Sequence, residues 1–148
     1  ALNASNGSLA LGWEGPVTYT KVIGGSPWAS GADDLLVAGL ENHQIVGLRA
    51  SDGINPGDFP LRPYGVREYP GGAVVWNGVI YIGGADGRFL ALRRTSGSAD
   101  PGSGWRVFDS STQGLPGQFL GSPCLTGTTA DDRVVVGCTN SYLYAFPL

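Results

Sequence analysis

One segment occurs three times in this chain, and its copies end at Gly39, Gly83 and Gly137, 44 and then 54 residues apart. Each copy begins with two turn-forming residues, continues with a mostly apolar run and ends on the glycine; the copies are residues 33–39, 77–83 and 131–137. A turn residue and a second apolar stretch follow each glycine. Self-similarity at a period of about 20 to 50 residues is the signature of stacked repeat units. The sequence therefore predicts three equivalent structural units.

Two further sets of residues follow the same period. Residues 1–7 resemble residues 47–53 and 91–97, and each segment is followed by a large aromatic residue: Trp13, Phe59 and Trp105. The triplet Gly25-Ser26-Pro27 recurs as Gly121-Ser122-Pro123, with Gly72-Ala73-Val74 in its place in the middle unit. These anchors predict a single domain over residues 1–148, with units at about 1–46, 47–90 and 91–144 and a last strand that ends at 148.

Composition narrows the fold and the function classes. With 25 glycines and 10 prolines among 148 residues, long helices have little room, while 42% hydrophobic residues are enough for a buried core. The net charge is -3 and Lys21 is the only lysine, which argues against a nucleic-acid partner and against an anionic membrane surface. Apolar runs are strand-sized, far below the roughly 20 residues of a membrane span.

Each unit is expected to hold four short strands. The Asn77-Gly78 pair between two apolar runs is a strong hairpin signal, because both turn positions favour positive φ. The second and third strands are apolar on consecutive positions, which is typical of a sheet covered on both faces. A small residue in each third strand leaves a notch for an aromatic side chain, with Trp13 or Trp105 the natural candidates. Stacked four-stranded antiparallel sheets predict an all-β fold, a β-propeller.

The run of residues 78–92, followed by Thr95-Ser96-Gly97 and Trp105, resembles the repeat of pyrroloquinoline-quinone-type (quinoprotein-like) propellers. That family includes dehydrogenases, outer-membrane assembly lipoproteins and sensor ectodomains. Its enzymes hold the quinone (PQQ) in a central channel with a stacking tryptophan, adjacent cysteines and a calcium ion coordinated by carboxylates. Here the two cysteines are 14 residues apart, Trp13 and Trp105 fall at the fourth strand, and Trp28 and Trp76 follow the first strand. No cofactor is therefore expected, and PQQ with calcium belongs only to a dehydrogenase alternative.

Each unit corresponds to one propeller blade, and three blades do not close a ring, since propellers typically have about four to eight blades. The chain carries its strands out of phase with the unit boundaries and has no methionine. Two kinds of partner could complete the ring. One is other blades of the same parent chain, which we favour, and the other is further copies of this chain arranged in a closed ring. Either way, the expected partners include further propeller blades.

Candidate catalytic and metal-binding residues are few. His43, the only histidine, falls in a predicted turn at the position of Gly87 and Ser141, and no triad is visible around it. The pairs Asp33-Asp34 and Asp131-Asp132 occupy hairpin positions and lack the spaced oxygen ligands of a calcium loop. We therefore predict neither catalytic residues nor a metal site.

The sequence allows two covalent modifications, a disulfide and glycosylation, but does not decide whether either is present. Cys124 and Cys138 allow one disulfide, but the predicted hairpin places Cys124 opposite Val134 and Val135, so two free buried thiols are the alternative. Asn3 and Asn6 match the glycosylation sequon, although turn chemistry alone explains both segments.

The connections between units, at 14–24, 60–71 and 107–120, are expected on the same side as the turns between second and third strands. They carry aromatic and polar side chains suited to a protein or glycan ligand: Tyr19, Lys21, Tyr64, Arg67, Glu68, Tyr69, Gln113 and Phe119. The first hypothesis is a non-enzymatic binding or scaffold module. The alternatives are a segment of a quinoprotein dehydrogenase and a structural subunit of a larger assembly. Low lysine content, the sequons and a disulfide would each favour an extracytoplasmic location.

Overall fold

A computed structural model describes residues 5, 28–30, 33–40, 44–57, 59, 68–93, 106–126 and 132–148. For residues 28–30, 106 and 107 it describes the backbone alone. Within these residues the chain is built from antiparallel strands with a single 3-10 turn, η1 (Ser110–Gln113). The predicted all-β class is confirmed.

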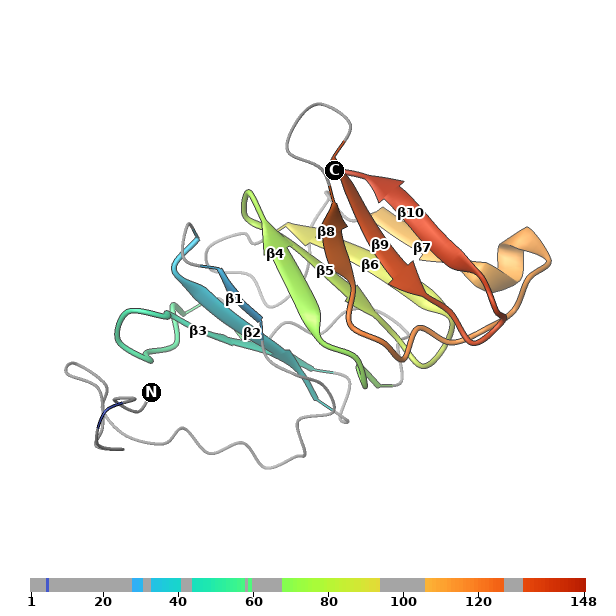
Figure 1. Cartoon of the computed structure of the whole chain (residues 1–148). Coiled ribbons are helices and arrows are strands. Elements are labelled where there is room, and N and C mark those ends of the chain that lie inside the picture. The colour runs from blue at the N-terminus through green and yellow to red at the C-terminus, as the bar shows by residue number, and fades with distance from the viewer. Residues whose placement is uncertain are drawn as a thin grey trace.

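The strands form three separate sheets that follow each other along the chain (Figure 1). The first sheet contains β1 (Trp28–Ser30), β2 (Leu35–Gly39) and β3 (Ile45–Leu48). The second contains β4 (Ala73–Trp76), β5 (Val79–Gly83), β6 (Arg88–Arg93) and β7 (Arg106–Asp109). The third contains β8 (Cys124–Thr126), β9 (Arg133–Gly137) and β10 (Leu143–Pro147). The second sheet lies between the other two, as in consecutive blades of a propeller.

Strand pairing explains the repeat and corrects one part of its alignment. Asn77 and Gly78 have φ of 49° and 72° and join Trp76 directly to Val79, which confirms the two-residue hairpin. In the three sheets Trp28 pairs with Val37, Val74 with Tyr81 and Cys124 with Val135. This register aligns Gly121-Ser122-Pro123 with Gly71-Gly72-Ala73. The expected match to Gly72-Ala73-Val74 is thus wrong by one residue, because short apolar runs do not fix register.

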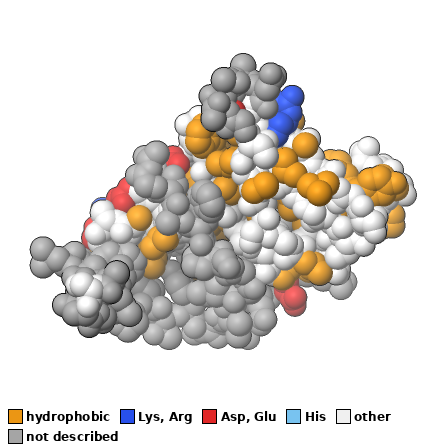
Figure 2. All heavy atoms as spheres, in the orientation of Figure 1, with side chains coloured by type: hydrophobic (Ala, Val, Ile, Leu, Met, Phe, Trp, Pro, Cys, Tyr) orange, Lys and Arg blue, Asp and Glu red, His pale blue; other side chains and the backbone are white. Residues whose placement is uncertain are grey.

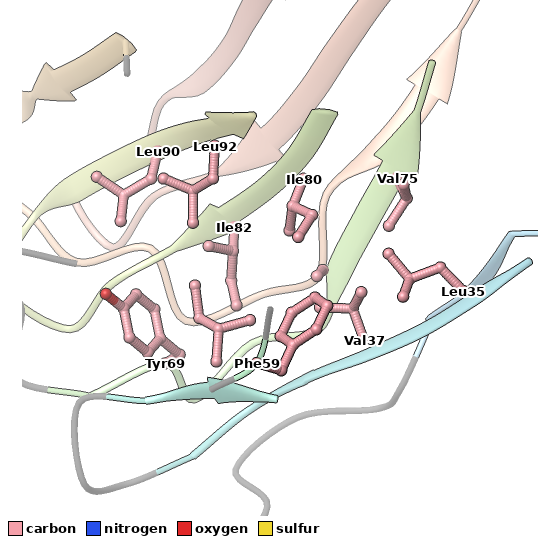
Figure 3. Packing of buried hydrophobic residues seen from close by; sticks show 11 residues of the cluster. Leu35, Val37, Phe59, Tyr69, Val75, Ile80, Ile82, Leu90 and Leu92 are labelled. Atoms are coloured by element: carbon pink, nitrogen blue, oxygen red, sulfur yellow. The ribbon is translucent and has the colours of Figure 1, made fainter. Parts of the chain in front are cut away.

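Apolar side chains from the facing surfaces of the first and second sheets form one core (Figure 3). Val37 and Ile45 of the first sheet meet Val75, Ile80 and Ile82 of the second, and all five are at most 2% exposed. Adjacent residues of β5 point to opposite faces, since Tyr81 belongs to the next core. The consecutive apolar positions of β5 therefore do reflect burial on both faces.

A second core fills the space between the second and third sheets and is rich in aromatic rings. Phe89 stacks on Phe146 with ring centroids 5.0 Å apart, and Phe108 lies 5.0 Å from Tyr144. Val134 and Val136 of β9 belong to this core and are at most 1% exposed. Offset and tilted aromatic pairs of this kind add to the stabilisation that area burial gives.

Glycines mark the places where a connecting segment approaches a sheet closely. A Cβ on Gly47 would come within 2.5 Å of the ring of Phe59, so the predicted notch in the third strand does receive an aromatic side chain. A Cβ on Gly39 would lie 2.3 Å from Tyr69 Cβ, and one on Gly83 would lie 2.4 Å from Phe119 Cβ. The glycines that end β2 and β5 are therefore seats for the aromatic residues of the segments that lead to the next sheet. Trp13 and Trp105 lie outside the described residues.

Candidate functional site

The turns between second and third strands share one backbone pattern in all three sheets. The first N–H after the second strand donates to a carbonyl at the start of the third strand or just before it: Leu40 to Gln44 (2.8 Å), Gly84 to Arg88 (2.8 Å) and Cys138 to Tyr142 (3.0 Å). Asp86 and Asn140 occupy equivalent positions, and each accepts a hydrogen bond on Oδ1 from the backbone N–H two residues later, at 3.2 Å. Gly87 and Ser141 follow with φ of 87° and 70°. These turns provide rigid positions for polar side chains at one end of the sheets.

The connection from β7 to β8 packs onto two of these turns. Its backbone donates two hydrogen bonds to the β5–β6 turn, from Ser110 N–H to Gly87 O (3.0 Å) and from Phe119 N–H to Gly84 O (3.1 Å). It is joined to the β9–β10 turn by Thr139, whose N–H donates to Gln118 O (3.0 Å) and whose Oγ1 accepts from Gln118 N–H (2.8 Å). The expectation that inter-sheet connections lie on the side of these turns is confirmed for this connection.

The preceding connection makes the same kind of contact. Ala85 N–H of the β5–β6 turn donates to Glu68 O at 2.9 Å, as Thr139 N–H does to Gln118 O one sheet later. We call the surface formed by residues 68–72, 84–87, 110–123 and 138–142 the loop face. Backbone hydrogen bonds join both connections to the β5–β6 turn, and they also join the β7–β8 connection to the β9–β10 turn.

An open pocket of about 480 Å³ lies in the loop face, between the β5–β6 turn and the β7–β8 connection. Its walls carry carboxylate, hydroxyl and amide groups: Asp86, Ser110, Ser111 and Gln118, with Ala85, Pro116 and Gly117. Ser110 is 1% exposed, and its Oγ donates to Gly117 O (3.0 Å), so it holds the wall in place. Ser111 and Gln118 are exposed and can meet a ligand.

Asp86, in the wall of this pocket, belongs to a cluster of charged groups with Arg88 and Asp109. Arg88 is 3.5 Å from a carboxylate oxygen of Asp86 and 3.5 Å from one of Asp109. Hydrogen bonds from the Ser111 hydroxyl and backbone N–H, with Arg88 a smaller contributor, lower the pKa of Asp109. Burial, with the nearby charge of Asp86, raises the pKa of the Tyr69 hydroxyl, so that group stays protonated. The pocket is polar, and the Asp86 carboxyl group in its wall lies beside the Arg88 guanidinium.

The structure places four of the eight predicted binding residues. Glu68 and Gln113 are exposed on the loop face, and their role in binding stays a prediction. Tyr69 and Phe119 are 0% exposed, so their expected role as surface residues is wrong: the Cβ and backbone carbonyl of each lie close against a glycine at the end of a second strand. Tyr19, Lys21, Tyr64 and Arg67 lie outside the described residues, as do His43, Asn3 and Asn6.

Sequence reasoning missed the polar residues that line the pocket. Asp86 is the turn residue that follows Gly83, and Ser111 and Gln118 lie in the connection expected over residues 107–120, where no pattern distinguishes them. Nothing in the sequence separates a loop residue that faces a pocket from one that faces solvent. The usable signal was the repeat, because Asp86 and Asn140 align.

The acidic pair at Asp33 and Asp34 has a structural role. Asp33 Oδ1 accepts from Gly78 N–H at 2.9 Å, which ties the first sheet to the second. Asp34, with φ of 47°, accepts from the Ser51 backbone N–H and hydroxyl, both at 2.7 Å. In the described part of the chain, no three His, Cys, Asp or Glu side chains are grouped as metal ligands. Asp131 is outside that part.

The two cysteines do not form a disulfide. Cys124 pairs with Val135, as expected from the hairpin, and Cys138 lies three residues further along; both thiols are free. Cys124 is exposed, so the alternative of two buried thiols is also wrong for this residue. Cysteines separated in this way do not supply the adjacent pair that quinoprotein enzymes use. The described residues therefore do not fit PQQ with calcium, and we derive no chemistry through that cofactor.

Comparison with known proteins identifies the fold. No protein-family profile matches the chain, and no curated protein matches it. A solved quinohemoprotein alcohol dehydrogenase from Pseudomonas putida HK5 is similar over 93% of this chain, with a TM-score of 0.59 and 17% identity. The chain has a PQQ-like β-propeller fold. It covers 21% of the length of that dehydrogenase.

A second propeller structure also matches. BamB from Moraxella catarrhalis is similar over 86% of this chain and 47% of its own, with a TM-score of 0.42 and 18% identity. Among the described residues of this partial propeller, no helix is long and apolar enough to cross a membrane.

Proposed function

We propose that this propeller segment is a non-enzymatic binding module whose loop face takes a protein ligand. The observation that carries the proposal is the combination of exposed apolar residues and fixed polar groups on that face. Leu115, Leu120 and Tyr142 belong to the segments of that face and are 36%, 43% and 52% exposed, and Asp86 and Gln118 line its pocket. Large apolar side chains on a rigid surface with polar neighbours are typical of protein interfaces.

The rigidity of the loop face supports this role. Hydrogen bonds of 2.6 Å from Asn140 Nδ2 to Leu115 O and 2.8 Å from Gln118 N–H to Thr139 Oγ1 hold two of its loops together. A preformed surface loses less conformational entropy when it binds than a mobile one. The low lysine content favours a location outside the cytoplasm, as part of the same proposal.

A selection from a displayed library of random 12-residue peptides tests the proposal. We expect peptides whose binding falls at least tenfold in a Leu115→Ser, Leu120→Ser, Tyr142→Ser triple variant. Ile54→Ser is the matched control, because Ile54 is also exposed, at 38%, but lies after β3, away from the loop face. Peptides that bind both variants equally would contradict the proposal, and selective binding on an immobilised oligosaccharide array would favour a glycan ligand.

The dehydrogenase alternative is tested separately. The similarity to the quinohemoprotein alcohol dehydrogenase is its supporting observation. Titration of the chain with PQQ and calcium ions, followed by quinone absorbance, is expected to show no saturable binding. Saturable binding with dye reduction would favour a dehydrogenase segment over a binding module.

A further inference from the structure

Most hydrogen-bond donors of the pocket between the β5–β6 turn and the β7–β8 connection are already used within the protein. Five backbone N–H groups of its walls donate to protein acceptors, namely those of Ala85, Ser110, Ser111, Gly117 and Gln118. Pro116 has no N–H. The hydroxyl groups of Ser110 and Ser111 also donate inward, to Gly117 O and to Asp109 Oδ1. A ligand in this pocket therefore meets few free donors.

Acceptors remain in the same walls. Asp86 lines the pocket, its side chain is 14% exposed, and its buried Oδ2 accepts no hydrogen bond from the described residues. The Ser111 hydroxyl still has lone pairs that can accept, and the exposed Gln118 side chain offers an amide oxygen. The free hydrogen-bonding capacity of the pocket thus lies mainly in its oxygen atoms.

The charge around the pocket has the sign that goes with these acceptors. Arg88 lies 3.5 Å from a carboxylate oxygen of Asp86 and 3.5 Å from one of Asp109, so one guanidinium faces two carboxylates. One net negative charge remains. Residues 107–126 contain no Lys or Arg, and Figure 2 shows no such side chain over η1, which Figure 1 locates at the start of the β7–β8 connection.

We propose that this pocket holds the basic side chain, arginine or lysine, of the protein ligand and so selects among ligands for the loop face. The inference rests on the proposed function, because it takes the ligand to be a protein. A guanidinium or ammonium group is positively charged and carries donors only, which matches a negative pocket with free acceptors. The Asp86 carboxylate is its main partner, and the Ser111 hydroxyl and Gln118 amide oxygen are further acceptors.

Other ligand groups match this pocket less well. A phosphate or carboxylate needs free N–H groups or an excess of positive charge, and neither is offered here. Sugar hydroxyl groups both donate and accept, so a wall with few free donors meets only part of their needs. The donor-only cation is the group that uses what the pocket has left.

The equivalent turn of the third sheet shows that this arrangement is not a general feature of the repeat. Asn140 stands at the position of Asp86, and its Nδ2 donates to Leu115 O at 2.6 Å and to the Tyr144 hydroxyl at 2.8 Å. That side chain is neutral and serves the structure. The β5–β6 turn has a carboxylate with a free oxygen at the same place, which points to a role in binding.

An isosteric substitution tests the role of the charge. Asp86→Asn keeps the acceptor for the Arg88 N–H, and Asn140 shows that such a turn accommodates asparagine. Asp52→Asn is the matched control, because Asp52 also accepts from the N–H two residues later, that of Ile54 at 2.9 Å, and lies outside the loop face. Both variants lose one negative charge.

The peptides selected on the loop face provide the first measurement. We expect each to contain an arginine or lysine whose replacement by glutamine weakens binding by about tenfold or more. Asp86→Asn should cause a similar loss, and the two changes together should cost no more than either alone, because they remove the same contact. Asp52→Asn should leave the affinity unchanged.

A change in the opposite direction sharpens the test. Gln118→Glu adds a second carboxylate to the wall and should tighten the binding of these peptides by about threefold. Gln118→Lys places a cation there and should weaken binding by about tenfold or more. Equal affinities for both variants would contradict the proposal.

A second measurement does not depend on the peptides. Nuclear magnetic resonance titrations with N-acetyl-arginine amide and N-acetyl-lysine amide should give saturable shifts of the Ser111 and Gln118 backbone amides. These shifts should be lost in Asp86→Asn, and N-acetyl-glutamate amide should produce none. Absence of saturable shifts with both basic probes, or equal shifts with the acidic one, would overturn the proposal.

The outcomes separate this inference from the proposed function. Loop-face peptides without a basic residue, or with affinities that Asp86→Asn does not change, would overturn the pocket assignment and leave the binding module intact. Saturable shifts with the basic probes, in the absence of any loop-face peptide, would support a cation pocket and contradict the protein ligand.

Discussion

The second and third sheets come from the same repeat but are buried to different extents. β5 (VIYIG) has four buried residues of five, whereas β9 (RVVVG) has two. The difference is not in the strand pattern, which is apolar in both. It arises because the second sheet has a neighbour on each face, while the described residues cover only one face of the third. The apolar pattern of a strand therefore leads to burial on both faces only where a neighbouring sheet lies against each face.

The largest expected difference in the free energy of unfolding is between removal of a buried side chain, Phe119, which lies over the second sheet, and removal of an exposed one, Leu143, on the third sheet. Phe119→Ala should lower the free energy of unfolding by about 4 kcal/mol, because it empties a fully buried site. Leu143→Ala should change it by less than about 0.5 kcal/mol, because Leu143 is 74% exposed. Urea unfolding of both variants measures the contrast, and comparable losses would mean that the third sheet is covered.

Glycine substitution sharpens the same comparison. Gly83→Val should destabilise by about 3 kcal/mol, because its side chain would clash with Phe119 Cβ and carbonyl oxygen. Gly137→Val should cost less than about 0.5 kcal/mol, since its side chain enters open space. Thermal unfolding followed by circular dichroism is sufficient to rank the two. Equal melting temperatures would contradict the assignment of Gly83 as a seat.

Two buried or half-buried tyrosines should respond in opposite directions when the hydroxyl is removed. The Tyr144 hydroxyl accepts a hydrogen bond from Asn140 Nδ2 at 2.8 Å, so Tyr144→Phe should cost about 1 kcal/mol. The Tyr69 hydroxyl is buried without a hydrogen-bond partner among the described residues, so Tyr69→Phe should be neutral or stabilise by up to about 1 kcal/mol. Denaturant titration at one pH gives both values. A clear loss for Tyr69→Phe would reveal an ordered water or other partner.

The smallest expected effect on the free energy of unfolding is the pH-dependent contribution of Asp109, the last residue of β7. The Asp109 carboxylate accepts from the Ser111 hydroxyl and N–H, which lowers its pKa in the folded chain. Its ionised form therefore adds stability above the unfolded pKa of about 3.9, and this is lost as pH falls through the folded value. Asp109→Asn should cost about 0.5 kcal/mol at pH 7 and progressively less below about pH 4. Unfolding curves across that range check the sign; a cost that persists at low pH would exclude the charge as its cause.

The all-β class and the hairpin turns were predictable because they depend on local residue patterns, and the repeat shows these patterns three times. Asn77-Gly78 fixes a hairpin by backbone preference, and the glycines at 39, 83 and 137 fix the ends of the second strands. The fourth strand was less clear: the connection expected from residue 107 begins only after Asp109, because Val107 and Phe108 continue β7. Strand ends depend on pairing with a neighbour, which the local sequence does not show.

The candidate site was predictable only in part. The sequence correctly predicted that the β7–β8 connection lies on the same side of the sheets as the turns between second and third strands. Tyr69 and Phe119 were assigned to the surface from their position in loops, yet both are buried. A loop residue is buried when the segment crosses a glycine at the end of a strand, and that crossing depends on contacts between distant residues. For the same reason Ser111 and Gln118, which line the pocket, could not be chosen over their neighbours.

By itself, the sequence determined the number of units, the all-β class and the positions of the tight turns, because these depend on residue preferences repeated along the chain. The tertiary structure decided which aromatic residues cover glycines, which polar groups reach the pocket and which face of the third sheet stays bare. These features depend on the distance between segments far apart in the sequence. Phe89 and Leu143 occupy equivalent positions in β6 and β10, and they are 3% and 74% exposed because the third sheet lies against Phe89.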